Sequence, residues 1–212
     1  MFNNREDAAL KLAEKLEKYK NTNGIILAIP GGGVPIGFII AKKLKLPLEI
    51  ILSKKIGHPI NSEYAIGSVT LHNIILNENI KDVSKEYIQK ERLEILNKLK
   101  EKYKIFMGEK KQTDLKNKTV IIVDDGIATG NTILAAIEDI KQNKPKEIIV
   151  AAPVAPKSVA SKLSKLVDDF ICLELPIEFM AVGQFYKNFS QVNVEDVIEL
   201  IKLSKENKIL SI

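Results

Sequence analysis

The chain has 212 residues, of which 45% are hydrophobic and 28% charged, a balance that is typical of a folded globular protein and excludes a disordered one. No apolar run approaches the roughly 20 residues of a membrane-spanning helix, and residues 1–7 lack the basic and apolar stretches of a signal peptide. The net charge of +5 comes from lysines scattered among glutamates, as in residues 86–104, so we expect a solvated surface rather than a nucleic-acid face. The single cysteine, Cys172, excludes an internal disulfide and indicates a reducing, cytoplasmic location.

Helix and strand signals alternate over the first fifty residues. Asn3 begins a pattern that is typical of a helix cap, and apolar residues then recur at helical spacing. An apolar strand at 24–29 leads into the glycine-rich loop 30–35, where Pro35 suits the first turn of the helix that follows. Residues 48–53 predict a second apolar strand.

The middle of the chain is more polar. Residues 54–68 are polar and punctuated by glycine and proline, which predicts a long connection of the kind that marks either function or disorder. Residues 69–77 predict a β-hairpin that turns near His72, and Ser84 opens a long amphipathic helix.

The second half returns to alternating apolar strands and helices. Strands are predicted at 119–123, 147–152 and 170–173, and helices at 132–142, 156–166 and 194–203. Apolar strands that alternate with helices predict an α/β fold with a doubly wound, mostly parallel sheet that is covered on both faces. We expect one domain over residues 1–212.

One short segment, residues 120–132, carries the strongest chemical signal. Four apolar residues bring a buried strand to its carboxyl end, where open α/β sheets bind ligands, and Asp124 and Asp125 follow. The small-residue loop and the helix after it offer backbone N–H groups and the positive end of a helix dipole to a phosphate. The carboxylates suit sugar hydroxyls or a cation. Phosphate-side contacts are predicted at Gly126, Ile127, Ala128, Thr129, Gly130, Asn131 and Thr132.

Other phosphate-binding motifs do not fit this segment. A Walker loop is excluded because no Gly-Lys-Ser/Thr closes it, and the glycine spacing is wrong for a dinucleotide fingerprint. The plainer alternative is a strand-to-helix turn with two solvated aspartates.

The segment resembles the motif of type I phosphoribosyltransferases that binds 5-phosphoribosyl 1-diphosphate (PRPP). That motif has four hydrophobic residues, two acids, three variable residues and Thr-Gly-x-Thr, and every position matches here. The chain is also similar to a little-characterised subgroup of predicted phosphoribosyltransferases over PGGGVPIG, KKIGHPINSEYAIGSV, VIIVDDGIATGNT and FMAVGQFYKNFSQV. The resemblance implies a type I phosphoribosyltransferase-like fold with a flexible loop and a small hood, which we expect at about 174–192.

The resemblance also implies a diphosphate-binding loop and a basic pair at a strand end. We expect Gly31, Gly32 and Gly33 to form this loop, and Lys54 and Lys55 to form the pair. Gly31 stands where the subgroup usually has an arginine, and Lys54 stands where it usually has another. Because arginine binds diphosphate bidentately and lysine does not, both departures weaken the predicted diphosphate site.

The implied activity is transfer of the phosphoribosyl group to a nitrogen acceptor, such as a nucleobase in nucleotide salvage, with release of diphosphate. The 5-phosphate would lie on residues 127–132 and the ribose hydroxyls on Asp124 and Asp125. Mg²⁺ would bridge ribose and diphosphate oxygens, and the two acids would reach it only through water or ribose. With Lys55, which would stabilise charge on the leaving diphosphate, these acids are the predicted catalytic residues.

The sequence leaves several structural and functional alternatives open. Loop 54–68, which contains His58, could close as a lid over PRPP and exclude water. The aromatic residues of 179–189 could form a hood over the acceptor or a small core, and Tyr186 is the predicted ligand contact among them. The alternative function is a regulatory protein that senses PRPP and binds nucleic acid without turnover, and a homodimer is a possible assembly.

Overall fold

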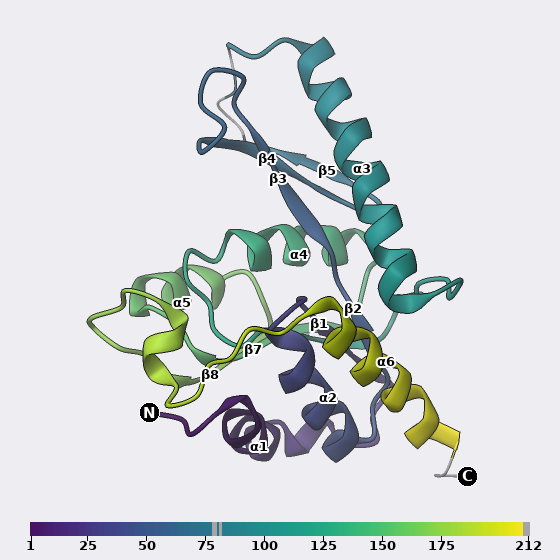
Figure 1. The fold of residues 1–212 in the computed structure, drawn as a ribbon, viewed down its shortest axis with the longest axis vertical. Coiled ribbons are helices and arrows are strands. Elements are labelled where there is room, and N and C mark those ends of the chain that lie inside the picture. The colour runs from purple at the N-terminus through teal and green to yellow at the C-terminus, as the bar shows by residue number, and fades with distance from the viewer. Residues whose placement is uncertain (78–79, 81, 210–212) are drawn as a thin grey trace.

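The computed structural model describes residues 1–77, 80 and 82–209, the last three without their side chains. Its centre is a five-stranded sheet in which every neighbouring pair is parallel (Figure 1). The strand order is β2 (Leu48–Ile50), β1 (Gly24–Ala28), β6 (Thr119–Val123), β7 (Glu147–Val154) and β8 (Asp169–Glu174). The order reverses between β1 and β6, and Ala28 pairs with Val123 there, so the loops after these strands start side by side. Ligands bind at such a switch point in open α/β sheets.

Helices cover both faces of the parallel sheet, which confirms the doubly wound prediction. One face packs against α1 (Arg5–Lys15), α2 (Gly33–Leu44) and α6 (Val194–Ile209), and the other against α4 (Asn131–Gln142) and α5 (Lys157–Leu163). Short 3-10 turns add η1 (Glu17–Tyr19) and η2 (Val182–Phe185). Side chains alternate along each strand, so Ile121 faces the first core and Ile122 the second.

A second, antiparallel sheet stands beyond α4 at the top of Figure 1. It consists of β3 (Ser53–Gly57), β4 (Ala65–Thr70) and β5 (Ile74–Leu76), with the long helix α3 (Lys85–Met107) beside it. The predicted hairpin near His72 and the Ser84 cap are confirmed, since Ser84 Oγ accepts from Tyr87 N at 3.2 Å.

Two boundaries differ from the prediction. Residues 54–68 are not one long loop but parts of β3 and β4 joined by a short turn, because Ile56 and Ile66 are both fully buried in the core that α3 shares. Single buried isoleucines among polar residues give little strand signal. The cap of α1 is Asn4 rather than Asn3, with Asn4 Oδ1 accepting from Asp7 N at 2.9 Å. Across the described residues, no helix combines the length and apolarity needed to cross a membrane.

Candidate active site

The loop after β6 presents free backbone donors to solvent. Within the described chain, the N–H groups of Ala128, Thr129 and Gly130 have no protein acceptor, whereas Ile127 N donates to Val154 O at 2.9 Å. Gly130 has a φ of +77°, and a Cβ there would lie 2.8 Å from Val159 Cγ1, so this turn requires glycine. Helix α4 begins at the next residue. Free amides followed by a helix N-terminus form a cradle for a phosphate group.

Asp124 and Asp125 lie at the end of β6, next to this cradle. Burial raises the pKa of Asp124 well above its ordinary value, and the neighbouring Asp125 carboxylate raises it further. Among the described residues, its one hydrogen bond comes from Asp125 N, which donates to Asp124 Oδ1 at 2.8 Å. A half-buried carboxylate with no cation within ion-pair distance in the described residues favours a ligand that brings a cation or hydroxyl donors.

Asp125 is held by Arg5, which the sequence analysis did not find. Arg5 Nε and its terminal nitrogen Nη2 each lie 2.8 Å from Asp125 Oδ2, and both side chains are nearly buried, at 12% and 13% exposure. Burial raises the pKa of Asp125, and the Arg5 charge opposes this rise. The arrangement leaves Asp125 Oδ1 without Arg5. The chain has only two arginines beside 30 lysines, so the choice of a forked guanidinium at position 5 was the available signal.

Arg5 and Tyr186 together form a clamp on Asp125, and its contacts extend into the segment after β8. The Arg5 guanidinium lies 3.9 Å from the Phe189 ring centre and donates to Ser190 O at 2.7 Å. The Tyr186 hydroxyl donates to Asp125 O, and its buried ring packs between Phe2 and Phe189. These contacts are structural, so a contact of Tyr186 with ligand stays a prediction.

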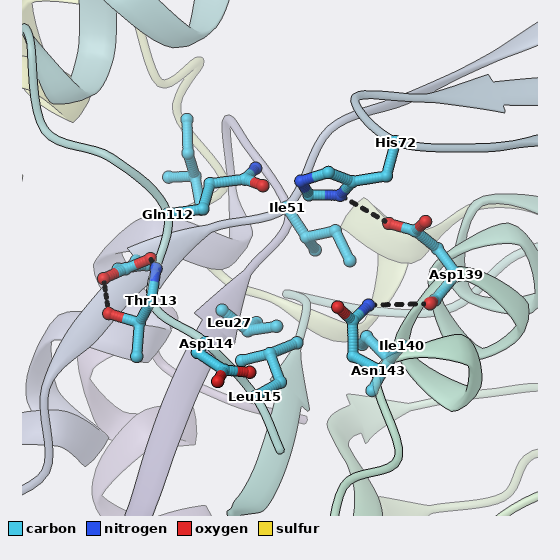
Figure 2. A pocket seen from close by; sticks show the side chains of 12 residues that line it. Leu27, Ile51, His72, Gln112, Thr113, Asp114, Leu115, Asp139, Ile140 and Asn143 are labelled. Carbon is cyan, nitrogen blue, oxygen red and sulfur yellow. Dashed lines mark hydrogen bonds and ion pairs between the residues drawn. The ribbon is translucent and has the colours of Figure 1, made fainter.

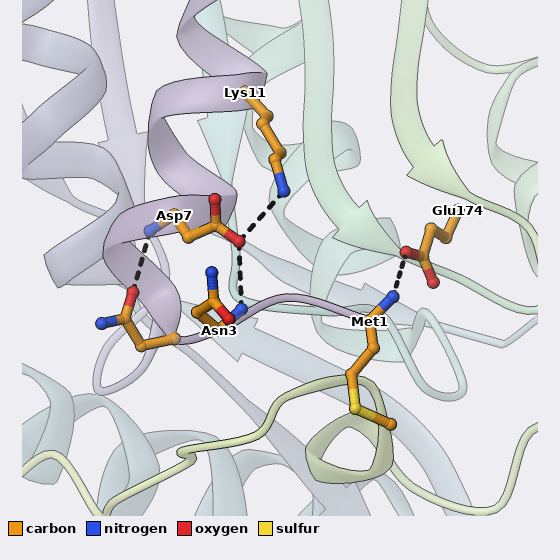
Figure 3. Close-up of polar contacts among 6 residues, drawn as sticks. Met1, Asn3, Asp7, Lys11 and Glu174 are labelled. Carbon is orange, nitrogen blue, oxygen red and sulfur yellow. Dashed lines mark hydrogen bonds and ion pairs between the residues drawn. The ribbon is translucent and has the colours of Figure 1, made fainter.

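The start of the chain is fixed by further polar contacts, shown in Figure 3. Asp7 accepts from Asn3 N and from Lys11 Nζ, each at 3.0 Å, and Met1 N lies 3.0 Å from Glu174 Oε1 at the end of β8. Together they hold the first turn of α1, and Arg5 with it, against the carboxyl edge of the sheet.

The glycine-rich loop after β1 packs directly on the acids, as the adjacent ends of β1 and β6 require. A Cβ on Gly32 would lie 1.7 Å from Asp125 Oδ2, and a Cβ on Gly33 would lie 2.8 Å from Val123 O. Neither position admits a side chain in this arrangement. At Gly31 a Cβ would lie 3.2 Å from Val192 O, so a side chain there needs a small shift of the segment near 192.

The side chains of the predicted basic pair, Lys54 and Lys55, point to opposite sides of β3, because neighbouring residues of a strand alternate between its two faces. Lys55 Nζ pairs with Glu63 Oε2 across the hairpin at 3.1 Å, and its catalytic role stays a prediction. Lys54 lines a cavity of about 430 Å³, together with Thr132 and two lysines of α3, Lys98 and Lys102. From the sequence, we expected these helix lysines on a solvated surface.

A second cavity, of about 280 Å³, lies beside the β4–β5 turn (Figure 2). Its polar wall includes Asp139, which is 5% exposed, with His72 Nδ1 at 3.7 Å and Asn143 donating to its backbone oxygen at 3.1 Å. None of the predicted site residues lines this cavity. It is therefore separate from the site around Asp124.

The donor set suits Mg²⁺ only in part. Asp124 offers the hard carboxylate oxygen that Mg²⁺ prefers, but in the described part of the chain no group of three or more His, Cys, Asp or Glu could hold a metal ion. A Mg²⁺ ion would therefore need oxygens from a ligand and from water.

This chain is similar in sequence to known proteins. The family model "Phosphoribosyl transferase domain" matches residues 3–188. A "putative phosphoribosyl transferase" of Mycobacterium tuberculosis (strain H37Rv) is 29% identical over 208 residues, which cover 95% of this chain and 46% of that protein. The chain thus spans about half the length of this curated relative.

Solved structures agree. The crystal structure of TT1426 from Thermus thermophilus has a TM-score of 0.85 at 29% identity, and the match covers 94% of this chain and 97% of that one. AQ2163 protein from Aquifex aeolicus shares the fold, with a TM-score of 0.51 at 12% identity and coverage of 81% and 74%.

Proposed function

Because the chain belongs to the phosphoribosyl transferase domain family, we propose that its site transfers the phosphoribosyl group of PRPP to a nitrogen acceptor and releases diphosphate. One observation carries the proposal: free amides at 128–130 adjoin a half-buried carboxylate, Asp124, that has no cation within ion-pair distance among the described residues. PRPP offers a phosphate to the amides and hydroxyls to the acid. In this proposal residues 1–212 act as one domain.

Each group at the site has a role that its contacts support. The amides of Ala128, Thr129 and Gly130, with the side chains of Thr129, Asn131 and Thr132, receive the 5-phosphate. Asp124, and Asp125 through the Oδ1 that Arg5 does not contact, accept hydrogen bonds from the ribose hydroxyls. Arg5 and Tyr186 position Asp125, so they act through it rather than on substrate. Gly126 lets the loop pass Val182, whose Cγ1 would lie 2.4 Å from a Cβ there.

The chemistry requires orientation and charge stabilisation more than a covalent nucleophile. The bond from C1 to diphosphate breaks, and the acceptor nitrogen bonds to C1 through an oxocarbenium-like transition state. When bound, Mg²⁺ supplies positive charge to the departing diphosphate oxygens, and Asp124 with ligand oxygens and water would hold it. Residues 174–192, which we propose as the hood, cross the edge of the site where Tyr186 contacts Asp125.

The test is release of diphosphate from PRPP and Mg²⁺ across a panel of nucleobases and other nitrogen acceptors. We expect one acceptor class to support turnover in the wild type and not in Asp124→Asn. Tight PRPP binding without release for any acceptor would instead favour a PRPP-sensing regulator. No binding of PRPP at all would overturn the proposal.

A further inference from the structure

The cavity of about 430 Å³, here called the lysine cavity, has a positively charged lining. It opens at the carboxyl ends of the sheet, with Pro30 on one side and Thr132, in the first turn of α4, on another. In the part of the chain that the structure describes, its charged lining consists of Lys54, Lys98 and Lys102, with no carboxylate.

Among the described residues, none of these three lysines has a carboxylate partner. In residues 1–77 and 82–206, no carboxylate lies within ion-pair distance of any of them, whereas the adjacent Lys55 pairs with Glu63. Lys98 and Lys102 are four residues apart on α3, so they share a face and repel each other. A bound anion would relieve that repulsion.

Helix α3 is held firmly enough to present them. Leu99, between the two lysines, is 4% exposed, and the Tyr87 hydroxyl donates to Gly57 O at the end of β3 at 2.9 Å. Further along, Lys205 of α6 donates to Met107 O at 3.3 Å. The lysine face of α3 is thus fixed relative to β3, which carries Lys54.

We infer that Lys98 and Lys102, with Lys54, bind the diphosphate group of PRPP, an inference that rests on the proposed function. PRPP has two anionic ends, and the neutral amides at 128–130 suit the less charged one, the 5-phosphate. The diphosphate end needs cations, and the lysine cavity lies between the β1 loop and Thr132. Lysines from a distant helix thereby supply charge beside a glycine loop that has none, Gly31 included.

The experiment compares two ligands on four proteins. Binding of inorganic diphosphate with Mg²⁺, and separately of ribose 5-phosphate, is measured by calorimetry for the wild type, Lys98→Ala, Lys102→Ala and Lys100→Ala. Lys100 is exposed on the same helix and does not line the cavity, so its variant matches the loss of charge. Because all three substituted lysines are exposed, thermal melting should show four folded proteins.

We expect Lys98→Ala and Lys102→Ala each to weaken diphosphate binding about tenfold, since a hydrogen bond to a charged group has this effect when lost. Ribose 5-phosphate binding should stay unchanged in both variants, and Lys100→Ala should bind both ligands as the wild type does. Unchanged diphosphate affinity in both cavity variants, a loss confined to ribose 5-phosphate, or no diphosphate binding by the wild type would each overturn the inference. Failure of the proposed function would look different: the wild type would bind diphosphate in the lysine cavity but neither PRPP nor ribose 5-phosphate.

Discussion

Two regions enclose the candidate site, and they are built in different ways. The motif loop, residues 124–130, follows the central buried strand β6. Arg5 and Tyr186 hold Asp125 of this loop from the early and the late parts of the chain. The β3–β4 hairpin instead extends away from the parallel sheet, and at its tip Ile60 is 90% exposed and Tyr64 is 61% exposed. In the proposed function, the first region would fix the geometry of the substrate and the second would enclose it.

The largest expected effect lies in the fixed region. Asp124→Asn should lower the rate of diphosphate release at least about a hundredfold, because the proposed function places this carboxylate against the hydroxyls of the reacting sugar. Kinetics with saturating PRPP and Mg²⁺ measure this loss. Glu138→Gln on α4, which also removes one charge, should leave the rate unchanged.

The variant Asp124→Asn should also change the stability of the protein in a pH-dependent way. Because the folded-state pKa of Asp124 is raised, its ionisation costs stability as the pH rises above its ordinary value of 3.8. Without ligand, Asp124→Asn should therefore unfold at a higher temperature than the wild type at pH 8, and this advantage should shrink as the pH falls toward 4. An advantage that is constant with pH would contradict the raised pKa.

The next largest effect is expected on the unfolding free energy when the clamp on Asp125 is broken. Arg5→Met leaves the nearly buried Asp125 carboxylate without its partner, which should cost about 3 kcal/mol of unfolding free energy. Denaturant unfolding measures this cost. The comparison is Lys11→Met in the same helix, where loss of the exposed pair with Asp7 should cost less than about 0.5 kcal/mol. Similar costs for the two variants would remove the special role of Arg5.

A smaller effect is expected in the glycine loop. Gly31→Arg restores the residue usual in the similar subgroup, but its Cβ would press on Val192 O. We expect a loss of about 1 kcal/mol and no gain in diphosphate release. Gly31→Ala separates the effect of the Cβ from that of the guanidinium. A more active and equally stable arginine variant would show that the lysine cavity does not replace it.

The smallest effect concerns the hairpin. If residues 58–64 close over the site, PRPP with Mg²⁺ should slow their limited proteolysis several-fold. Cleavage in the connection 108–115 serves as the internal control and should not change. Equal cleavage of the hairpin with and without ligand would leave it an open wall of the site.

The sequence predicted most of the parallel sheet and the motif loop because their signals are contiguous: an apolar strand, two acids, small residues and a helix. It missed Arg5, Lys98 and Lys102 because their importance comes from residues far away in the chain. The polar hairpin 54–68 was missed for a related reason, since Ile56 and Ile66 are its fully buried large apolar side chains and the packing of α3 determines that burial. Glu63 shows the same limit, because its pairing with Lys55 needs the hairpin to exist.

The clamp on Asp125 also orders events during protein synthesis. Arg5 leaves the ribosome 120 residues before Asp125, and Tyr186 follows 61 residues after it. The nascent chain can therefore pair α1 with the motif loop early, but the hydroxyl that holds Asp125 from the other side arrives only when the parallel sheet has been fully translated. A ribosome-bound chain that ends just beyond α4 would carry the whole motif and still lack the late half of its support.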